Sequence, residues 1–338
     1  MLTLGIETSC DETGVAVTEG RIVLANIVSS SVHLHKRYGG VVPEIASRFH
    51  VEYILEVLSE ALKRSGKDLK DVRLVAATNG PGLVGALLVG ISLAKSLSYS
   101  LKVPLIGVNH VFAHLYSAFL NDKAERPEFP FVGLVVSGGH TALFYCEDVD
   151  RQKLLGQTQD DAIGEAYDKV AKILGLGYPG GPVVEKAARH ATGRNRMVFP
   201  KSYLGRDSLD FSFSGIKTAV LYYVKGLRRL NKELVSDICY AFQEAALDAL
   251  VEKAFLAAKI NNADRIVIGG GVAANKRLRK KLVDEARFSG SKIYFPEFEY
   301  CVDNAAMVGS LGEALYKRGH RSDMYMSAEP NLEVVNAE

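Results

Sequence analysis

The sequence has few cysteines and no large excess of charge of either sign. Its four cysteines, Cys10, Cys146, Cys239 and Cys301, are far apart and form no CxxC pair. This spacing favours free thiols in a reducing compartment over a disulfide framework. Lys and Arg (41) nearly balance Asp and Glu (39), so the formal net charge is only +2. Any surface for a nucleic acid must therefore be a local patch.

Long apolar runs and a leader-like N-terminus are also missing. The longest run, Leu83–Leu97, has about fifteen residues with three polar or charged side chains, fewer than the roughly 20 that span a bilayer. The first residues include Glu7 and no basic segment, which argues against a signal peptide. We therefore expect a cytoplasmic protein. Hydrophobic (48%) and charged (24%) fractions are ordinary for a globular chain, and 338 residues at about 150 per domain predict two domains or one two-lobed unit.

A three-strand pattern occurs twice, about 130 residues apart. Each copy has an apolar strand, a polar turn and two further strands. The expected strands are Leu2–Ile6, Val15–Val17 and Ile22–Val28 in the first copy, and Val132–Val136, Ala142–Cys146 and Lys153–Gln157 in the second. This weak repeat predicts two related lobes.

Elsewhere, strands and helices alternate, which predicts an α/β fold with mixed sheets. We expect helices at Pro43–Arg64, Leu83–Ser98, His110–Leu120, Ala162–Leu174, Pro182–Ala191, Gly215–Arg229, Lys232–Lys259, Ala274–Ala286 and Asn304–Arg318. Further strands are expected at Val72–Ala77, Pro104–Val108, Arg265–Ile268 and Lys292–Phe295. We expect a hinge at Asp122–Pro130 and a loosely held tail after Gly319.

A GxGxxG motif, Gly80–Gly85, follows a strand and opens a helix. A dinucleotide-binding turn of this kind needs a carboxylate about 20 residues on, at the end of the next strand. That strand ends at Asn109 and His110. The motif therefore favours tight backbone packing at a helix start.

Three other segments are candidates for binding a nucleotide. The turns Thr8–Cys10 and Ser137–Gly139 occupy equivalent places in the two repeats, and small residues there would expose amides and hydroxyls to a phosphate. Either turn alone is better explained as an ordinary hairpin, but two such turns at equivalent places favour a nucleotide held between the two lobes. The third segment, Gly269–Gly271, is followed by Asn275. Three glycines would allow a flat base to approach the backbone, with the amide as donor and acceptor; close helix–strand packing is the alternative.

Two histidines, His110 and His114, stand at i and i+4 on one helix face, the correct spacing for one metal ion. A zinc peptidase would have a glutamate next to the first histidine, and Val111 stands there instead. Asp303 is the obvious distant carboxylate, although it could equally be a helix N-cap. His33 and His35 form a competing pair on one side of an extended segment, which we interpret as a surface or substrate loop.

Charged residues on helices give weaker signals. Asp168 and Glu185 follow glycine-bearing loops, where they could bind sugar hydroxyls or simply lie on a solvated face. Two basic groups could follow an RNA backbone or equally be solvated faces. The first is Lys276, Arg277, Arg279, Lys280 and Lys281; the second is Lys225, Arg228, Arg229 and Lys232.

Taken together, these motifs resemble the TsaD family of tRNA threonylcarbamoyltransferases, with the bacterial type the best match. The motifs that carry the resemblance are Gly5–Thr13 (GIETSCDET), Tyr38–Arg48 (YGGVVPEIASR), Gly80–Leu87 (GPGLVGAL), His110 and His114, Val136–Thr141 (VSGGHT), Asp168 with Gly180 and Gly181, Asp210–Gly215 (DFSFSG), Gly269–Asn275 (GGGVAAN) and Asp303–Met307 (DNAAM). They agree in order and spacing over nearly the whole chain.

The resemblance implies an actin-like ATPase (ASKHA) fold: two lobes of duplicated βββαβα topology with mixed sheets and a central cleft. It implies an N-terminal lobe at 1–125, completed by the C-terminal helix at about 304–338. The other lobe would be 126–303, with a helical insertion at about 160–235. It also implies transfer of the threonylcarbamoyl group from threonylcarbamoyl-AMP to N6 of adenosine 37 in tRNAs that read codons beginning with A.

The resemblance further implies the site residues. His110, His114 and Asp303 would bind one divalent metal ion, Fe(2+) most readily and Zn(2+) as the alternative. Archaeal-type relatives have a tyrosine ligand at the position of Val135, so the metal here should keep an open position. The substrate loop would be Val135, Val136, Ser137, Gly138 and Gly139; Asp168 and Glu185 would bind ribose hydroxyls, and Gly181 and Asn275 would border the adenosine of an ATP-type nucleotide.

Expected partners are tRNA, a separate synthase that makes the adenylate, a paralogous TsaB-like subunit and a small TsaE-like ATPase. The general base is open, and Asp11 or Glu12 on the first turn is our hypothesis. Three alternatives compete: a metallopeptidase, an actin-like ATPase or sugar kinase that only binds nucleotide, and a scaffold of an RNA-modifying complex. The two histidines argue against the kinase, because phosphoryl transfer does not need them.

Overall fold

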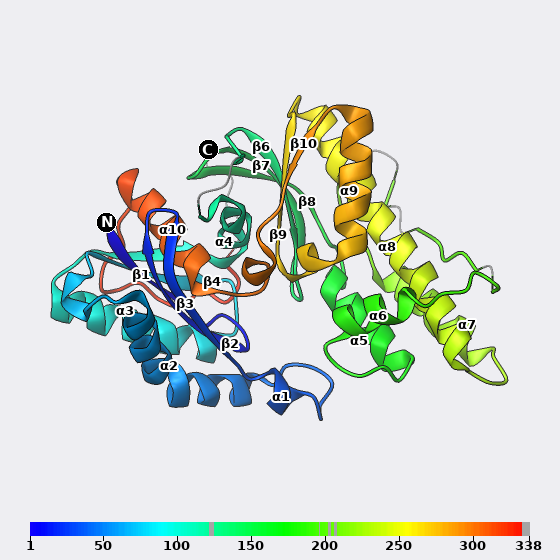
Figure 1. The fold of residues 1–338 in the computed structure, drawn as a ribbon, viewed down its shortest axis with the longest axis horizontal. Helices are drawn as coiled ribbons and strands as arrows, with labels where there is room; N and C mark the ends of the chain where they lie inside the picture. Colours follow the sequence, from blue (N-terminus) through cyan, green and yellow to red (C-terminus); the bar gives the residue numbers. More distant parts are fainter. Residues whose placement is uncertain (122–124, 196, 202–203, 206–207, 333–338) are drawn as a thin grey trace. The chain divides into compact units, whose positions relative to one another are not determined.

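The computed structural model describes residues 1–121, 125–195, 197–201, 204–205 and 208–332 (Figure 1). The chain divides into two compact units. Unit 1 comprises Met1–Phe129, Asp148–Gln152 and Pro296–Glu338, and unit 2 comprises Pro130–Glu147 and Lys153–Phe295. Each is described by itself below.

The sheet of unit 1 has five strands in the order β3-β2-β1-β4-β5. The strands are β1 (Leu2–Glu7), β2 (Glu12–Glu19), β3 (Ile22–Ser30), β4 (Leu74–Gly80) and β5 (Leu105–Asn109). β1, β2 and β3 form an antiparallel meander, and β4 and β5 continue parallel to β1. β1 and β4 are apolar over most of their length because both faces of the sheet are covered.

The other five-stranded sheet has the order β10-β9-β6-β7-β8. Its strands are β6 (Phe131–Val136), β7 (Thr141–Asp148), β8 (Arg151–Gln157), β9 (Arg265–Gly269) and β10 (Lys292–Tyr294). β6 and β7 are antiparallel, whereas β9 and β10 run parallel to β6. The two sheets therefore have the same strand order and the same strand directions when their strands are numbered along the chain. This confirms the predicted repeat and the α/β fold with mixed sheets.

Helices cover both faces of the unit 1 sheet (Figure 1). α2 (Pro43–Ser65) and α3 (Val84–Leu101) pack together on one face; α10 (Ala305–Lys317) and α4 (His110–Tyr116) lie on the other. The contact with α10 is close because a Cβ on Gly5 would lie 2.2 Å from the Ala305 carbonyl oxygen. Short helical turns complete this unit: α1 (Val32–His35), η1 (Leu69–Asp71), η2 (Ser117–Phe119) and η4 (Phe298–Tyr300).

Unit 2 is richer in helix. α8 (Lys232–Ile260) packs against β6 and β9 and contacts α6 (Gly180–Ala188), α7 (Ser214–Lys225) and α9 (Lys276–Ser289). α5 (Ile163–Ile173) packs on α6 and α7. A 3-10 turn, η3 (Gly271–Ala274), precedes α9, which therefore begins later than the sequence predicts.

Two local predictions are wrong. The segment with His33 and His35 is helical in α1, and His35 is fully buried, with its Nε2 3.0 Å from Ser31 Oγ. The chain from Gly319 to residue 332 is held in place by contacts with the rest of unit 1, and is not loosely held as predicted. It adds a bridge to β5, binds the end of β4 and packs Met326 against the core; the bonds are Ser322 N to Leu105 O (2.9 Å) and Glu329 N to Asn79 O (2.8 Å). Residues 122–124 of the expected hinge, and 333–338 of the tail, lie outside the described residues.

Among the described helices, α3 alone is long and apolar enough to cross a membrane by length and composition. One face of it is buried in unit 1, at Ala86, Leu87, Gly90, Ile91 and Ala94. Its approach to the sheet depends on Gly90, where a Cβ would lie 2.4 Å from Thr8 Oγ1. α3 thus packs as a core helix of unit 1.

Candidate metal centre and ligand site

Helix α4 brings His110 and His114 together at the end of β5. Asn109 caps the helix: its side-chain oxygen accepts hydrogen bonds from Val111 N (2.9 Å) and Phe112 N (3.3 Å). The cap fixes His110 as the first helical residue, and His114 follows one turn later on the same face. The centroids of the two imidazoles lie 4.6 Å apart.

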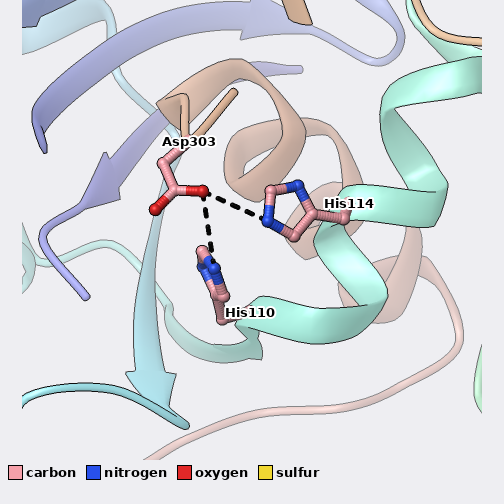
Figure 2. Close-up of side chains that lie close together, drawn as sticks. All are labelled: His110, His114 and Asp303. Atoms are coloured by element: carbon pink, nitrogen blue, oxygen red, sulfur yellow. Dashed lines mark ion pairs between the residues drawn. The ribbon is translucent and has the colours of Figure 1, made fainter. Parts of the chain in front are cut away.

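Asp303 completes the cluster from the loop before α10 (Figure 2). Its Oδ1 lies 3.1 Å from His114 Nε2 and 3.6 Å from His110 Nε2. The N-cap of α10 is Asn304, which accepts a hydrogen bond from Met307 N (3.0 Å). The alternative role of Asp303 as the cap is therefore wrong. One ligand atom from each of the three residues lies within 4.8 Å of the others.

The chemistry of this cluster fits a divalent cation. His110 and His114 are buried, and neither ring nitrogen of His114 makes a hydrogen bond of good geometry among the described residues, although Nε2 lies 3.1 Å from Asp303 Oδ1. A buried imidazole without well-formed hydrogen bonds is costly, and a cation bound at a lone pair would remove part of that cost. Two imidazoles and one carboxylate suit zinc and iron and leave coordination positions open. All three ligand candidates belong to unit 1.

Glu7, the last residue of β1, is fully buried beside His110. Its Oε2 lies 3.0 Å from His110 Nδ1. Burial alone would lower the pKa of His110, but the Glu7 and Asp303 carboxylates outweigh it and raise that pKa to about 9. Burial likewise acts to raise the pKa of Glu7, and the charge of His110 and its hydrogen bond hold it below its usual value. The two groups thus stabilise each other's charged forms.

Further carboxylates surround the cluster. Asp11 is buried on the first turn, and Glu12 is half-buried at the start of β2, where it accepts a hydrogen bond from Ser30 Oγ (3.2 Å). Burial, together with the negative charges of Asp11 and Asp303, raises the pKa of Glu12 well above its ordinary value. The same combination raises the pKa of the Cys10 thiol. This concentration of negative charge is a second reason to expect a cation.

The prediction that the first turn, Thr8–Cys10, is a phosphate site is wrong. Thr8 and Ser9 are buried. The Ser9 carbonyl accepts from Leu83 N (2.8 Å), and the Ser9 hydroxyl lies 3.2 Å from His110 Nδ1. His50 of α2 donates from Nε2 to the Cys10 carbonyl (3.0 Å). Hydrogen bonds thus hold the turn to residues of α2 and at the start of α3, and the Ser9 hydroxyl contacts the histidine site.

The second turn is different. Ser137 N donates to His140 O (2.8 Å) and His140 N donates to Ser137 Oγ (3.0 Å), so the serine closes the turn. Gly138 and Gly139 between them are exposed, and in the described part of the chain neither amide donates to a protein acceptor. Two free amides on a rigid turn suit an anion.

Glycines bring the surrounding backbone close to this second turn. A Cβ on Gly164 would lie 2.6 Å from Ser137 O, and one on Gly270 would lie 2.4 Å from Val136 O. Gly270 has φ +95°, which also favours glycine. The ends of the parallel strands β6 and β9 thus meet at one edge of the sheet, where open α/β sheets bind ligands. Gly181 has open space beside it.

The remaining predicted ligand residues of unit 2 have protein partners. Asp168 Oδ1 accepts from Gly180 N (2.6 Å), and Glu185 Oε1 accepts from Lys276 N (3.2 Å). Asn275 caps α9 by accepting from Leu278 N (2.9 Å), and its nitrogen donates to Gln243 Oε1 (3.0 Å). The expected loop is also shorter than predicted, because Val135 and Val136 are buried residues of β6.

A family model described as TsaD, tRNA N6-adenosine threonylcarbamoyltransferase, matches residues 22–310. Proteins of that name are 50% identical in Dictyoglomus turgidum over 334 residues (98% of both chains) and 49% identical in Kosmotoga olearia over 337 residues (99% of this chain, 100% of the relative). The chain belongs to the TsaD family. This membership confirms the resemblance seen in the sequence and makes the chain a transferase.

Solved structures support the actin-like fold of this TsaD family member. Full-length HypF, in a phosphate- and nucleotide-bound form, matches 94% of this chain and 46% of its own, with a TM-score of 0.59 and 16% identity. Component A of the (R)-2-hydroxyglutaryl-CoA dehydratase of Acidaminococcus fermentans matches 94% of this chain and 97% of its own, with a TM-score of 0.53 and 17% identity. At such low identity these likenesses concern the fold alone.

In this TsaD family member the GxGxxG motif has the predicted packing role. A Cβ on Gly82 would lie 2.6 Å from Ser9 O, one on Gly80 would lie 2.1 Å from Glu329 O, and one on Gly85 would lie 2.5 Å from Ser47 Oγ. The motif therefore brings the backbone close to the first turn and to the chain that follows Gly319.

The two basic groups differ in their surroundings. On α9, Arg277 Nε and Nη2 donate to both oxygens of Glu244 (2.7 and 2.6 Å), and Lys281 lies 2.6 Å from Asp248. These carboxylates belong to α8, so much of the first group joins two helices. Lys225, Arg228, Arg229 and Lys232, by contrast, are exposed and have no ion pair within the described ranges.

Sequence reasoning did not single out Glu7, Ser9 or Asn109 as part of the TsaD family histidine site. One signal was available for Glu7, which is the one charged residue in the apolar run of β1. A charge in a buried strand needs a partner. Ser9 and Asn109 carry no comparable signal, because polar residues are common in turns and at helix starts.

Proposed function

We propose that this chain transfers the threonylcarbamoyl group from threonylcarbamoyl-AMP to N6 of adenosine 37 in tRNAs that read codons beginning with A. The observation that carries the proposal is the buried cluster of His110, His114 and Asp303 in a chain of this family. We propose that these residues bind one divalent metal ion, Fe(2+) in preference to Zn(2+). When bound, the ion would supply positive charge that favours acyl transfer by offsetting charge on carbonyl and phosphoryl oxygens.

We propose that unit 2 binds the donor nucleotide. The exposed amides of Gly138 and Gly139 would bind the phosphate, as fixed donors that need no rearrangement. Asp168 and Glu185 would accept from the ribose hydroxyls, and Gly181 and Asn275 would border the adenine. The open space beside Gly181 and the short second turn support this assignment.

We propose Glu12, in preference to Asp11, as the base that accepts the amine proton. A carboxylate is a better base when its pKa lies closer to the working pH, and burial together with the charges of Asp11 and Asp303 shifts the pKa of Glu12 upward from its usual value. Glu12→Gln should slow transfer by about 100-fold without weakening donor binding. A full transfer rate in this variant would exclude the role.

We propose that tRNA is bound by the exposed basic group Lys225, Arg228, Arg229 and Lys232. Replacing its two arginines by Gln should weaken tRNA binding and flatten the plot of log affinity against log salt by about one to two units. Arg277→Gln, which removes an arginine paired with Glu244, is the matched control and should leave that slope unchanged. An unchanged slope for the first variant places the RNA elsewhere.

We propose a paralogous TsaB-like subunit, a small TsaE-like ATPase and a synthase as cytoplasmic partners. The outer faces of α2 and α3 support a protein partner, because Val51, Leu55, Val84 and Leu88 are exposed there. Leu55→Glu should abolish co-elution with the TsaB-like subunit and leave the isolated chain folded.

The deciding experiment is mass spectrometry of nucleosides from tRNA incubated with this chain, threonylcarbamoyl-AMP and the partners. We expect threonylcarbamoyl-adenosine with the wild type and its loss in His110→Ala. If the wild type gives no product with partners that support a known family member, the proposed reaction is wrong.

A further inference from the structure

Glu7 lies behind the histidine cluster, at the end of β1, and its carboxylate contacts His110. Among the described residues, three buried groups form hydrogen bonds with its carboxylate. Ser9 N donates to Oε1 (2.6 Å), Thr78 Oγ1 donates to Oε2 (2.6 Å), and His110 Nδ1 lies 3.0 Å from Oε2.

These contacts determine which nitrogen of His110 keeps its proton when the ring is neutral. An ionised carboxylate can only accept, and it already accepts from Ser9 N and Thr78 Oγ1. His110 Nδ1 must therefore donate to it. The nearby Ser9 hydroxyl, 3.2 Å from Nδ1, has a lone pair for the same proton. The other nitrogen, Nε2, is the one that points to Asp303 Oδ1, 3.6 Å away.

We propose that Glu7 is a positioning residue for the metal centre: it holds the proton of His110 on Nδ1 and so directs the Nε2 lone pair toward Asp303 and His114. A metal-binding histidine needs a neutral lone pair on one nitrogen, and a carboxylate behind the ring sets both the tautomer and the ring orientation. The inference rests on the proposed metal centre and adds a residue to it.

Thr78 has a supporting role in the same arrangement. It stands on β4, which pairs with β1, and its side chain is buried. With Ser9 N on one oxygen and Thr78 on the other, the carboxylate of Glu7 is held at both ends. Its third bond can then hold the ring of His110 in one orientation.

A second buried glutamate of unit 1 provides a matched control. Glu313 of α10 accepts from a backbone amide, Gly20 N (2.7 Å), and from a threonine, Thr3 Oγ1 (3.2 Å). Its cationic partners are Lys317, 2.7 Å away, and the amino group of Met1, 3.2 Å away, rather than a histidine. Glu313 thus matches Glu7 in burial and hydrogen bonding, but not in contact with the metal candidates.

The test is the affinity for Zn2+, measured on the full-length chain by competition with a chromogenic chelator after metal removal. In Glu7→Gln, an NH2 group replaces one of the two accepting oxygens. This NH2 group is a donor, and it would face either the Ser9 N donor or the donors of Thr78 and His110. We expect Zn2+ to bind 10- to 100-fold more weakly. Glu313→Gln should bind Zn2+ as the wild type does, even if it melts at a lower temperature.

A milder pair of variants keeps the test decisive if Glu7→Gln does not fold. Thr78→Val removes one donor to Glu7 without touching His110, and Thr3→Val does the same for Glu313. We expect weaker Zn2+ binding in Thr78→Val alone. Wild-type affinity in Glu7→Gln, or in Thr78→Val where only that variant folds, overturns the role of Glu7. An equal loss of Zn2+ affinity in Glu7→Gln and Glu313→Gln also overturns this role. The same holds for an equal loss in Thr78→Val and Thr3→Val. Failure of the wild type itself to bind Zn2+ would instead overturn the metal centre.

Discussion

The turn Thr8–Asp11 and the turn Ser137–His140 follow equivalent strands of two sheets with the same topology, yet they differ in how their hydrogen-bonding groups are used. In the first, Ser9 and Cys10 are bound by α3 and α2, and the serine hydroxyl reaches His110. In the second, the turn closes on itself and leaves the amides of Gly138 and Gly139 exposed. One repeated framework thus gives a buried side-chain site in unit 1 and an open backbone site in unit 2.

This difference follows from a few side chains. Between its strands the first turn has no glycine and is crowded by the glycine-rich start of α3, since a Cβ on Gly82 would lie 2.6 Å from Ser9 O. The second turn has two glycines with nothing within 4 Å of a Cβ built on either. In the first case the glycine lies on the segment that packs against the turn, because close packing leaves no room for a Cβ there. In the second case the glycines lie on the turn itself, where they leave the amides open to an anion.

The largest effect should come from removing a metal candidate. His114→Ala should lose bound metal and lower the rate of transfer by at least about 100-fold, because the second imidazole is then missing from the cluster. His320→Ala, an exposed histidine of the same unit paired with Asp150, should change neither. Metal content per chain and the yield of modified nucleoside check both. Full metal content in His114→Ala would overturn the assignment of His110, His114 and Asp303 to a metal centre.

The next effect concerns the second turn. Gly138→Val has room in the fold, so its free energy of unfolding should stay within about 0.5 kcal/mol of the wild type, but the branched side chain would shield the amides. We expect KM for threonylcarbamoyl-AMP to rise by about tenfold, the equivalent of 1.4 kcal/mol. Steady-state kinetics and denaturant melts measure the two quantities.

Gly164→Ala is the contrasting variant. Its Cβ would lie 2.6 Å from Ser137 O, so it should destabilise the chain by about 1–3 kcal/mol through overpacking. If Gly138→Val binds the donor normally, the second turn is an ordinary hairpin and the contrast between the two turns has no functional meaning.

The sequence predicted the strands, most helices and the histidine pair, because these depend on local periodicity and spacing. His110 and His114 are one helical turn apart wherever that helix lies. Asp303 was predicted as the obvious distant carboxylate, but its distance from the histidines depends on how α10 packs. The prediction that both turns are phosphate sites was wrong for the first turn. The polar sequence Thr8–Cys10 does not reveal that His50 and Leu83 donate hydrogen bonds to its carbonyl oxygens.

The basic group on α9 shows the same limit. The spacing of Arg277 and Lys281 indicates a charged helix face, but it does not reveal that Glu244 and Asp248 of α8 lie opposite. The segment after Gly319 carries no strong periodicity, and its order depends on partners far away in the sequence. In each case the missing information is tertiary contact.

A smaller effect is expected at the cap beside Asp303. Asn304→Ala should destabilise the chain by about 1 kcal/mol and weaken Zn2+ binding several-fold, because Asp303 loses its fixed neighbour. Asn231, which caps α8 by accepting from Leu234 N (2.8 Å), is the control: Asn231→Ala should cost a similar stability without changing Zn2+ affinity. Equal Zn2+ affinity in both variants would show that the cap does not fix Asp303.

The smallest effect is a pH dependence that tests how His50 holds the first turn. Burial lowers the pKa of His50 in the folded chain, and its bond to Cys10 O offsets this only in part. The unfolded chain therefore takes up the proton first, so the stability held by neutral His50 is present above about pH 6.5 and is lost as the pH falls through the lower folded pKa. His50→Gln keeps a donor for Cys10 O but does not titrate. Its melting temperature should fall less than that of the wild type between pH 7 and pH 5, by a few degrees at most. Equal falls in the two proteins would mean that His50 is not what locks the turn, and the contrast with the second turn would then rest on α3 alone.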